Sequence, residues 1–368
     1  MSATAIDNAR RPREPRANTL KAGQLPRFAE LYALGGALAV SAAFLALIGF
    51  NVVGWLVLAA VVYLVGLGIV SAVVENRRRA TDRVVRGLVT VAFLLALAPL
   101  LSTLITVIIN GVGALNWTFL SHSYSTTFNA QTLKVEITQG ALQAIVGTLI
   151  ITGIAALISI PVGILTAIYL VEYAKPGHWM PRTVTFLVDV MTGIPSIVAG
   201  LFAFSLFTLI LGPKAFSGFS ASVALSVLMI PIVVRSSEEM LKLVSHELRE
   251  ASYALGVSKF LTIVKIVLPT AIAGLVTGVM LAIARVIGET APIFMAASFT
   301  NNFNSNPFSG PMQTLPVMVY TGYKFPGTNV AASFASAWGA ALLLIIIVVI
   351  LNLIARIVAK VFAPKGLR

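Results

Sequence analysis

Long runs of apolar residues constrain this chain more than any other feature of its sequence. A run of about 20 apolar residues crosses a lipid bilayer as a helix. The eight runs that meet this criterion cover residues 31–50, 53–75, 87–110, 140–172, 184–212, 219–235, 268–298 and 334–358. The fourth, fifth and seventh runs are longer than one crossing requires, so they are expected to tilt or break. The sequence therefore predicts an all-α integral membrane protein.

The composition agrees with that prediction and excludes several kinds of chemistry. Hydrophobic residues make up 58% of the chain and charged residues only 11%, whereas soluble domains carry about 25% charged residues. The chain has no cysteine, which excludes disulfides, thiolate metal sites and catalytic thiols. Its three histidines, His122, His178 and His246, are too widely spaced to predict a histidine metal cluster. We therefore predict neither a metal nor a cofactor.

The positive charges are divided unevenly between the two predicted sides of the membrane. Of the 26 Lys and Arg residues, 22 lie in tails and loops on one side, three lie on the other, and Arg285 lies inside a run. Positive residues concentrate on the cytoplasmic side of membrane proteins, so both termini are predicted to be cytoplasmic. The net charge of +13 is thus explained by membrane topology, and we predict no nucleic-acid partner.

The segments outside the apolar runs add three expectations. Residues 1–28 are rich in Arg, Pro and Ala without apolar periodicity, which predicts a disordered basic tail that touches anionic membrane lipids. The polar segments 111–139 and 299–332 are expected to lie outside the membrane, on the side opposite the termini. Residues 361–368 are expected to form a short cytoplasmic tail.

The longest predicted cytoplasmic loop, residues 235–269, carries the start signals of several short helices. Ser236 and Glu239 have the spacing of a capping box. Ser245 and Ser258 are each expected to cap a further helix. The loop is therefore predicted to be helical between its turns.

The helix that Ser245 is expected to start is amphipathic. Leu248, Ala251 and Leu255 share one of its faces, and Gly256 is expected to follow it in the left-handed conformation. A helix that lies with this face against the membrane presents its other face to a soluble partner. The alternative is a surface helix that merely connects two spans.

The spacing of this loop resembles the EAA loop of ABC importer permeases. The matching positions are Glu250, Ala251, Ser252, Gly256, Ile266, Leu268 and Pro269, with Ser252 in place of the second Ala. The resemblance implies that residues 236–267 form a coupling loop that docks on an ATP-binding subunit. It assigns the contact with that subunit to Glu250, Ala251, Ser252 and Gly256.

Three further segments resemble the permeases of the Pst phosphate importers, and two of them are most similar to the A type (PstA-type). They are residues 193–202 (GIPSIVAGLF), 284–292 (ARVIGETAP) and 315–320 (LPVMVY). The resemblance covers residues 87–368. It implies a six-helix permease core at residues 87–360, preceded by two extra transmembrane helices at residues 29–86, in a bacterial cytoplasmic (inner) membrane.

The same resemblance implies a set of partners. They are a homologous second permease subunit, two ATP-binding subunits, an extracytoplasmic phosphate-binding protein and phosphate itself. No phosphate-cradling Gly-x-x-x-x-Gly-Lys-Ser/Thr loop occurs in the chain, so this subunit is not expected to hydrolyse ATP or to be an enzyme.

Two charges inside the seventh run require an explanation, because a charge within a span is costly. At i and i+4, Arg285 and Glu289 are expected to share one helix face in the outer half of the membrane. In one interpretation the pair locks its helix to a neighbour through Asp189. In the other, both residues line the substrate path, where Arg285 attracts an oxyanion through bidentate hydrogen bonds.

Glycine and proline interrupt the fifth and seventh runs. Gly193, Pro195 and Ser196 are hinge or gate candidates in the fifth run, and Pro292 is one in the seventh. Gly200 is expected to allow close helix approach. The alternative for each residue is ordinary packing.

Three rival functions stay open. The cargo of such a permease is phosphate or another oxyanion, such as molybdate, sulfate or phosphonate. An ion-coupled secondary transporter would need no ATP-binding partner, although internal repeats typical of that class are not evident. A membrane scaffold that signals phosphate status is compatible with the sequence as an added role.

Overall fold

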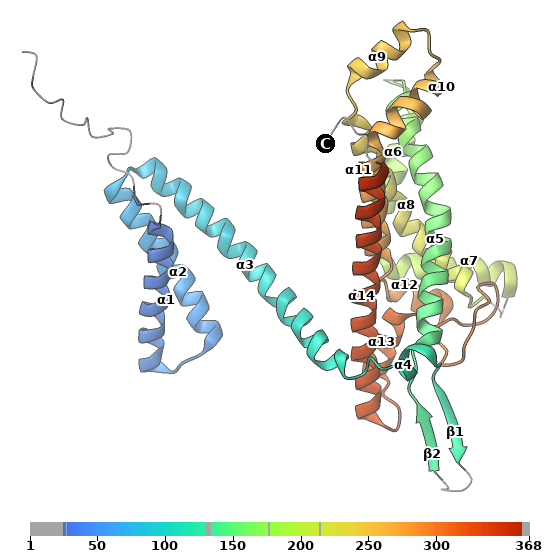
Figure 1. Cartoon of the computed structure of the whole chain (residues 1–368), viewed down its shortest axis with the longest axis horizontal. Helices are drawn as coiled ribbons and strands as arrows, with labels where there is room; N and C mark the ends of the chain where they lie inside the picture. The colour runs from blue at the N-terminus through green and yellow to red at the C-terminus, as the bar shows by residue number, and fades with distance from the viewer. Residues whose placement is uncertain (1–24, 27, 130–133, 176, 213–214, 363–368) are drawn as a thin grey trace, which may run out of the picture. The chain divides into compact units, whose positions relative to one another are not determined.

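The computed structural model describes residues 25–26, 28–129, 134–175, 177–212 and 215–362. The chain divides into two compact units, residues 1–104 and 105–368, which are described separately (Figure 1). Most of the predicted N-terminal tail and the residues beyond 362 lie outside the described residues.

The elements follow in this order along the chain. They are α1 (Ala29–Ile48), α2 (Val52–Val74), α3 (Arg77–Val112), α4 (Trp117–Ser121), β1 (Ser125–Asn129), β2 (Lys134–Thr138), α5 (Leu142–Ile168), η1 (Tyr169–Tyr173), α6 (Trp179–Thr192), α7 (Ser196–Leu211), α8 (Gly218–Lys242), α9 (His246–Ala254), α10 (Lys259–Thr262), η3 (Ile263–Val267), α11 (Leu268–Val286), α12 (Ala291–Ala297), α13 (Leu315–Lys324) and α14 (Val330–Phe362). The segments η1 and η3 are single π-helical turns that continue α5 and precede α11.

Seven helices in the described residues are long and apolar enough to cross a membrane, and the pair α6 and α7 raises the number to eight if it is one broken span. The prediction of a helical membrane protein is confirmed. Outside the spans, β1 and β2 form a short antiparallel hairpin in the predicted polar segment 111–139. That segment is too polar for a span, and its backbone groups pair across two strands instead.

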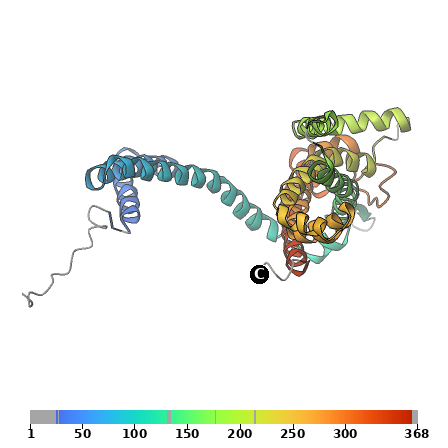
Figure 2. The ribbon, with the colours of Figure 1, turned by 90° about the horizontal axis from the view of Figure 1, so that it is seen from above.

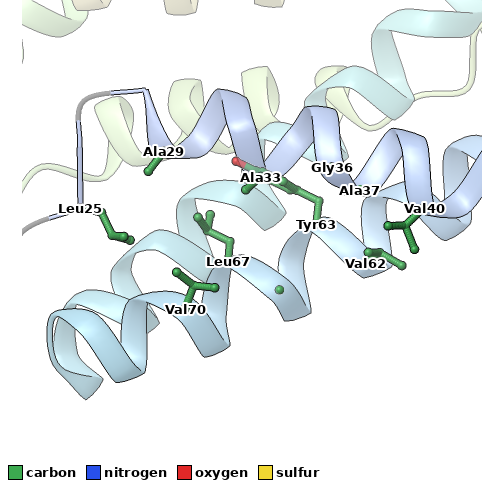
Figure 3. Close-up of a pocket in the computed structure, with 11 residues that line it drawn as sticks. Leu25, Ala29, Ala33, Gly36, Ala37, Val40, Val62, Tyr63, Leu67 and Val70 are labelled. Carbon is green, nitrogen blue, oxygen red and sulfur yellow. The ribbon is translucent and has the colours of Figure 1, made fainter.

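The first unit contains the hairpin of α1 and α2. Asn51 caps α2 by accepting hydrogen bonds from the backbone N–H of Val53 and Gly54. Trp55 ties the two helices together by donating from its indole nitrogen to the carbonyl of Leu38, at 2.9 Å. The helices leave an apolar cavity of about 240 Å³ between them, and Figure 3 shows the small and aliphatic side chains that line it together with Tyr63.

A buried carboxylate joins α2 to α3 at the end of this hairpin. Arg83 donates two hydrogen bonds of 2.9 Å to the two oxygens of Glu75 and a third, of 3.1 Å, to Glu30 on α1. Ser71 and the backbone N–H of Leu25 also donate to Glu75. These donors, with Arg83 first, lower the pKa of Glu75 to about 2.

In the second unit, α5 and α8 pack closely and in parallel. Ser222 donates to the carbonyl of Ile151 and Ser226 to that of Ala155, so the register advances in the same direction on both helices. Small residues line this contact, which lets the two backbones approach, as is typical of membrane helices.

The pair α6 and α7 returns the chain between these parallel helices. It bends by 105° at residues 193–195, and Figure 1 shows α7 lying across the axis of α8. Because α5 and α8 run in the same direction, the segment between them has to bring the chain back to the end of the unit where α5 begins. The fifth run, predicted over 184–212 and expected to tilt or break, is thus broken into α6 and α7.

The helix α8 is longer than predicted, since it continues through Ser236 to Lys242. The expected capping box at Ser236 and Glu239 was therefore wrong. Glu238 accepts hydrogen bonds from Arg235 and from Lys242, at helical spacings of three and four residues. These pairs support a continuous helix where the sequence pattern alone indicates a break.

The glycine at position 147 provides a test of this packing. A Cβ atom there would lie 1.9 Å from the carbonyl oxygen of Gln313, whereas a Cβ at Gly153 on the same helix would meet nothing within 4 Å. We expect Gly147→Ala to destabilise the second unit by about 1–3 kcal/mol, because the backbone at Gln313 has to move. Gly153→Ala is expected to be neutral or to stabilise by about 0.5–1 kcal/mol. Thermal unfolding of both variants in the same detergent measures the difference, and equal midpoints would contradict this account.

The carboxylate of Glu75 gives a pH-dependent prediction. Its pKa falls on folding from 4.5 to about 2, so its stabilising effect is present above about pH 5 and is lost as the pH falls towards 2. We expect Glu75→Gln to speed hydrogen exchange in α2 and α3 at neutral pH, with the gap from wild type closing in acid. Glu247→Gln, at an exposed position on α9, is the control. A gap that stays constant down to pH 2 would contradict the prediction.

Candidate functional site

The loop singled out by the sequence folds into a compact element at one end of the second unit. The chain leaves α8 at Lys242, forms α9 over residues 246–254, and then runs through α10 and η3 into α11 without a break. Figures 1 and 2 show α9 and α10 lying over the end of the helical bundle, at the end opposite the β-hairpin. We call α9 together with α10 the coupling element.

One buried arginine holds α9 onto the bundle. Arg249 donates two hydrogen bonds to Oε1 of Glu172, at 3.1 and 2.7 Å, and its side chain is 9% exposed against 5% for Glu172. The same guanidinium donates to the backbone carbonyls of Leu241, Val244 and Ser245, where α8 ends and α9 begins. It therefore fixes the turn before α9 and the end of α5 in one network.

Two further contacts join the coupling element to the π-helical turns. The hydroxyls of Ser252 and Thr262 share a hydrogen bond of 2.8 Å, directly before η3. The ammonium of Lys259 lies 5.0 Å from the ring centre of Tyr173, the last residue of η1. The turns η1 and η3 thus both adjoin the residues that seat α9, and π-turns inside α-helices are frequent at functional sites.

The inward face of α9 differs from the face that the apolar pattern indicates. Arg249 and Ser252 are the buried residues of α9, whereas Leu248, Ala251 and Leu255 are exposed. These apolar residues are therefore not part of the chain's own core. The buried face of α9 carries the hydrogen-bonded ion pair of Arg249 with Glu172 instead. Ser252, assigned by resemblance to the contact with a partner, is instead 3% exposed and faces the bundle.

The turn after α9 has the conformation predicted from the sequence. Gly256 has a φ of +73°, and a Cβ atom there would meet nothing within 4 Å. A side chain at this position is therefore opposed by the backbone conformation and not by a neighbouring atom. Glu250 and Ala251 are exposed on α9, beside this turn.

A second cluster of charges lies between α6 and α8. Arg235 hydrogen-bonds Asp189 on α6 and, at 2.9 Å, Glu238 on its own helix. Asp189 therefore pairs with Arg235, which corrects the expectation that it partners Arg285 and Glu289. Across the described residues, no three histidine, aspartate or glutamate side chains converge to form a metal site.

Arg285 and Glu289 do not form the helical pair that their spacing predicts. The helix α11 ends at Val286, and the chain turns at Ile287 and Gly288 before α12 begins. Pro292 stands in the first turn of α12, where its missing N–H costs no helical hydrogen bond. Arg285 is exposed and Glu289 half-buried, and no ion pair joins them.

The predicted hinge and gate residues lie at breaks between helices. Gly193 ends α6, Pro195 precedes α7, and Ser196 is the first residue of α7. The predicted close approach at Gly200 is confirmed, since a Cβ there would lie 2.6 Å from the Cα of Pro292. Pro292 is buried in the first turn of α12, so it starts a helix rather than kinking one.

Sequence reasoning missed the Arg249–Glu172 pair. Seventy-seven residues separate the two positions, and neither belongs to an apolar periodicity or to a capping pattern. Two signals were available in the sequence. Glu172 is the lone carboxylate at the end of the fourth apolar run, and Arg249 lies next to Glu250 in the EAA-like segment. Only the packing of α9 over the end of α5 joins them.

Comparison with known proteins agrees with these features. The profile of the family described as "Binding-protein-dependent transport system inner membrane component" matches residues 159–366. The phosphate transport system permease protein PstA 1 of Mycobacterium tuberculosis (strain ATCC 25618 / H37Rv) is 44% identical over 283 residues, which cover 77% of this chain and 88% of that protein. PstA of Mycobacterium leprae (strain TN) is 43% identical over 281 residues, 76% of this chain and 89% of that protein. PstA of Haemophilus influenzae is 35% identical over 280 residues, 76% of this chain and 94% of that protein.

The buried ion pair predicts how α9 responds to substitution. We expect Arg249→Met to cost about 3–5 kcal/mol locally, because it leaves the Glu172 carboxylate buried without its partner. Hydrogen exchange of the α9 amides should rise strongly, while Arg182→Met, an exposed arginine on α6, should leave it unchanged. In the double variant Arg249→Met with Glu172→Leu, part of the protection should return. Undisturbed exchange in Arg249→Met would show that the pair does not seat α9.

Proposed function

We propose, because this chain belongs to the family of binding-protein-dependent transport system inner membrane components, that it is the PstA-type permease subunit of an ATP-driven phosphate importer. The observation that carries this conclusion is the identity of 44% with a phosphate transport permease over 88% of its length. The chain is a multi-pass protein of the inner membrane and is the transmembrane component, which lacks an ATPase domain.

The family works in complexes that include an ATPase and a binding protein. In our proposal two ATP-binding subunits serve this chain and a homologous second permease, and a phosphate-binding protein delivers the cargo from outside. Both termini and the coupling element lie in the cytoplasm. This orientation is supported by the excess of Lys and Arg on that side of the chain.

The coupling element is the proposed docking site for the ATP-binding subunit. Glu250 and Ala251 are exposed there beside the turn at Gly256, together with the apolar side chains of Leu248 and Leu255. Ser252 lies on the buried side of α9 and holds the helix in place through its hydrogen bond with Thr262. Because α9 is held along its buried side, a displacement of α9 by the ATP-binding subunit is expected to move α5 through η1 and α11 through η3.

Arg285 is the proposed residue of the substrate path. It is exposed in this chain, at the end of α11 furthest from the coupling element, and among the described residues no carboxylate pairs with it. A charge at membrane depth has to face protein or water, so its exposed side is expected to face the second permease. A free guanidinium binds phosphate oxygens in a bidentate manner. Glu289, half-buried nearby in sequence, is proposed to tune that site.

The broken crossing is the proposed gate. Gly193, Pro195 and Ser196 lie at the 105° bend between α6 and α7. The close packing of Gly200 on Pro292 couples α7 to α12, directly after the segment that carries Arg285 and Glu289. A movement of α7 is thus expected to shift the path residues.

The rival functions are weaker on specific grounds. An ion-coupled carrier would leave the family match over residues 159–366 without explanation. Another oxyanion is disfavoured because the relatives above are all named as phosphate permeases. Residues 1–86, including the basic tail and the first two helices, have no assigned part in transport, and contact with membrane lipids is their proposed role.

Uptake of labelled phosphate into vesicles tests the function. The complete complex is reconstituted with wild-type chain, Gly256→Asp or Arg285→Gln. We expect wild type to require ATP, Gly256→Asp to lose the ATP-binding subunits on purification, and Arg285→Gln to retain them but lose most uptake.

Matched controls are Gly177→Asp and Arg182→Gln. Gly177 is also a glycine of positive φ with open space around it, but it lies outside the coupling element, and Arg182 is an exposed arginine on α6. Both controls should transport normally. Uptake that runs without ATP and is indifferent to Gly256→Asp would refute the proposal.

A further inference from the structure

A pocket with both polar and apolar walls lies in the second unit at the end opposite the coupling element, between the start of α5, the end of α13 and the start of α14. Its volume is about 140 Å³. We propose that this pocket is a binding site for the imported oxyanion, which neutral hydrogen-bond donors hold there before it enters the membrane-spanning path. The inference rests on the proposed function, since that function supplies the cargo.

The lining of the pocket is rich in amides and hydroxyls and has no charged residue among the residues described. The polar members are Tyr124, Gln139, Gln143, Asn301, Gln313, Thr321, Ser333 and Ser336. Amides and hydroxyls donate hydrogen bonds without carrying charge. The described lining also contains no carboxylate, so no negatively charged side chain in it repels an anion.

Two of the amides are set in place by the surrounding backbone and by α14. Gln143, which is 2% exposed, donates to the carbonyl of Gly140 and accepts from the backbone N–H of Tyr124. Gln139 accepts a hydrogen bond of 2.8 Å from Ser336. Gln139 also lines the pocket, and its amide nitrogen is a further donor in our proposal.

The observation that points to a ligand is Gln313. It is 3% exposed and lines the pocket, yet its side-chain oxygen accepts no hydrogen bond and its nitrogen donates none within the part of the chain described. Buried polar groups are nearly always hydrogen-bonded, so an amide in this position calls for a partner that the chain does not supply. Rotation of the amide presents either its nitrogen or its oxygen to that partner.

The size and charge of the pocket favour a weakly held oxyanion. Its volume of about 140 Å³ equals nearly five water molecules at about 30 Å³ each, which leaves room for one tetrahedral oxyanion. A protonated oxyanion also offers a hydroxyl that an amide oxygen accepts. A transport path requires binding that is favourable enough for entry and weak enough for release. Donors without a cation meet both requirements.

The chain's lack of cysteine makes a direct test possible. Phe325 lines the pocket and is 63% exposed, whereas Tyr323, two residues earlier, is 64% exposed and does not line it. Phe325→Cys and Tyr323→Cys are compared in the complete complex without ATP. Inorganic phosphate or chloride of the same ionic strength is added, and a neutral thiosulfonate reagent modifies the thiols. Mass spectrometry of this chain gives the rates.

We expect phosphate to slow modification of the Phe325→Cys variant at least threefold and to leave that of the Tyr323→Cys variant unchanged. Adding Gln313→Leu, which keeps the size of the side chain and removes its amide, should abolish the protection. An unaltered rate for Tyr323→Cys in the Gln313→Leu background shows that the fold is intact.

Phosphate that protects neither thiol, or protects both equally, would overturn the proposed pocket. So would protection that survives Gln313→Leu. These failures are distinct from failure of the proposed function, because ATP-driven phosphate uptake by the wild-type complex is measured separately.

Discussion

The interior of a lipid bilayer offers the peptide backbone no hydrogen-bond partner, and the architecture of this chain follows from that constraint. Spans have to be helical, because a helix satisfies its backbone groups internally. Irregular backbone at such depth is tolerated where protein surrounds it. In the second unit, Pro292 at the start of α12 packs against Gly200 of α7, directly after the break between α11 and α12. Pro292, at the start of α12, is thus also the residue through which α12 contacts α7.

Where the helices end, buried ion pairs take over the role that packing has inside the spans. Arg249 joins the end of α5 to the turn before α9, and Arg83 joins α1, α2 and α3 of the first unit. Each arginine makes several hydrogen bonds in one plane, which suits guanidinium better than ammonium. Such networks define one arrangement sharply, since a half-satisfied buried charge is costly. If α9 transmits movement from a partner to the spans, it has to be held in one position on the bundle.

The sequence predicted the features that depend on local chemistry. The apolar runs located the spans, and the predicted glycine after α9 does have positive φ. The failures share a different cause. Ser236 has the spacing of a cap but lies inside α8, and Arg285 and Glu289 have helical spacing but lie on either side of a turn. In each case the spacing of two residues was not enough to decide whether the helix continued.

The sequence by itself therefore determined that this chain is a helical membrane protein and which family it resembles, because hydropathy and motif spacing are local properties. The tertiary structure alone decided which charges pair, since Glu172 with Arg249 and Asp189 with Arg235 are far apart along the chain. It also decided that the side-chain oxygen of Gln313 is buried without a hydrogen-bond partner among the described residues, beside residues of α5 and α14. Partners of this kind are set by how helices pack, and that packing depends on shape in three dimensions, which no periodicity along one run encodes.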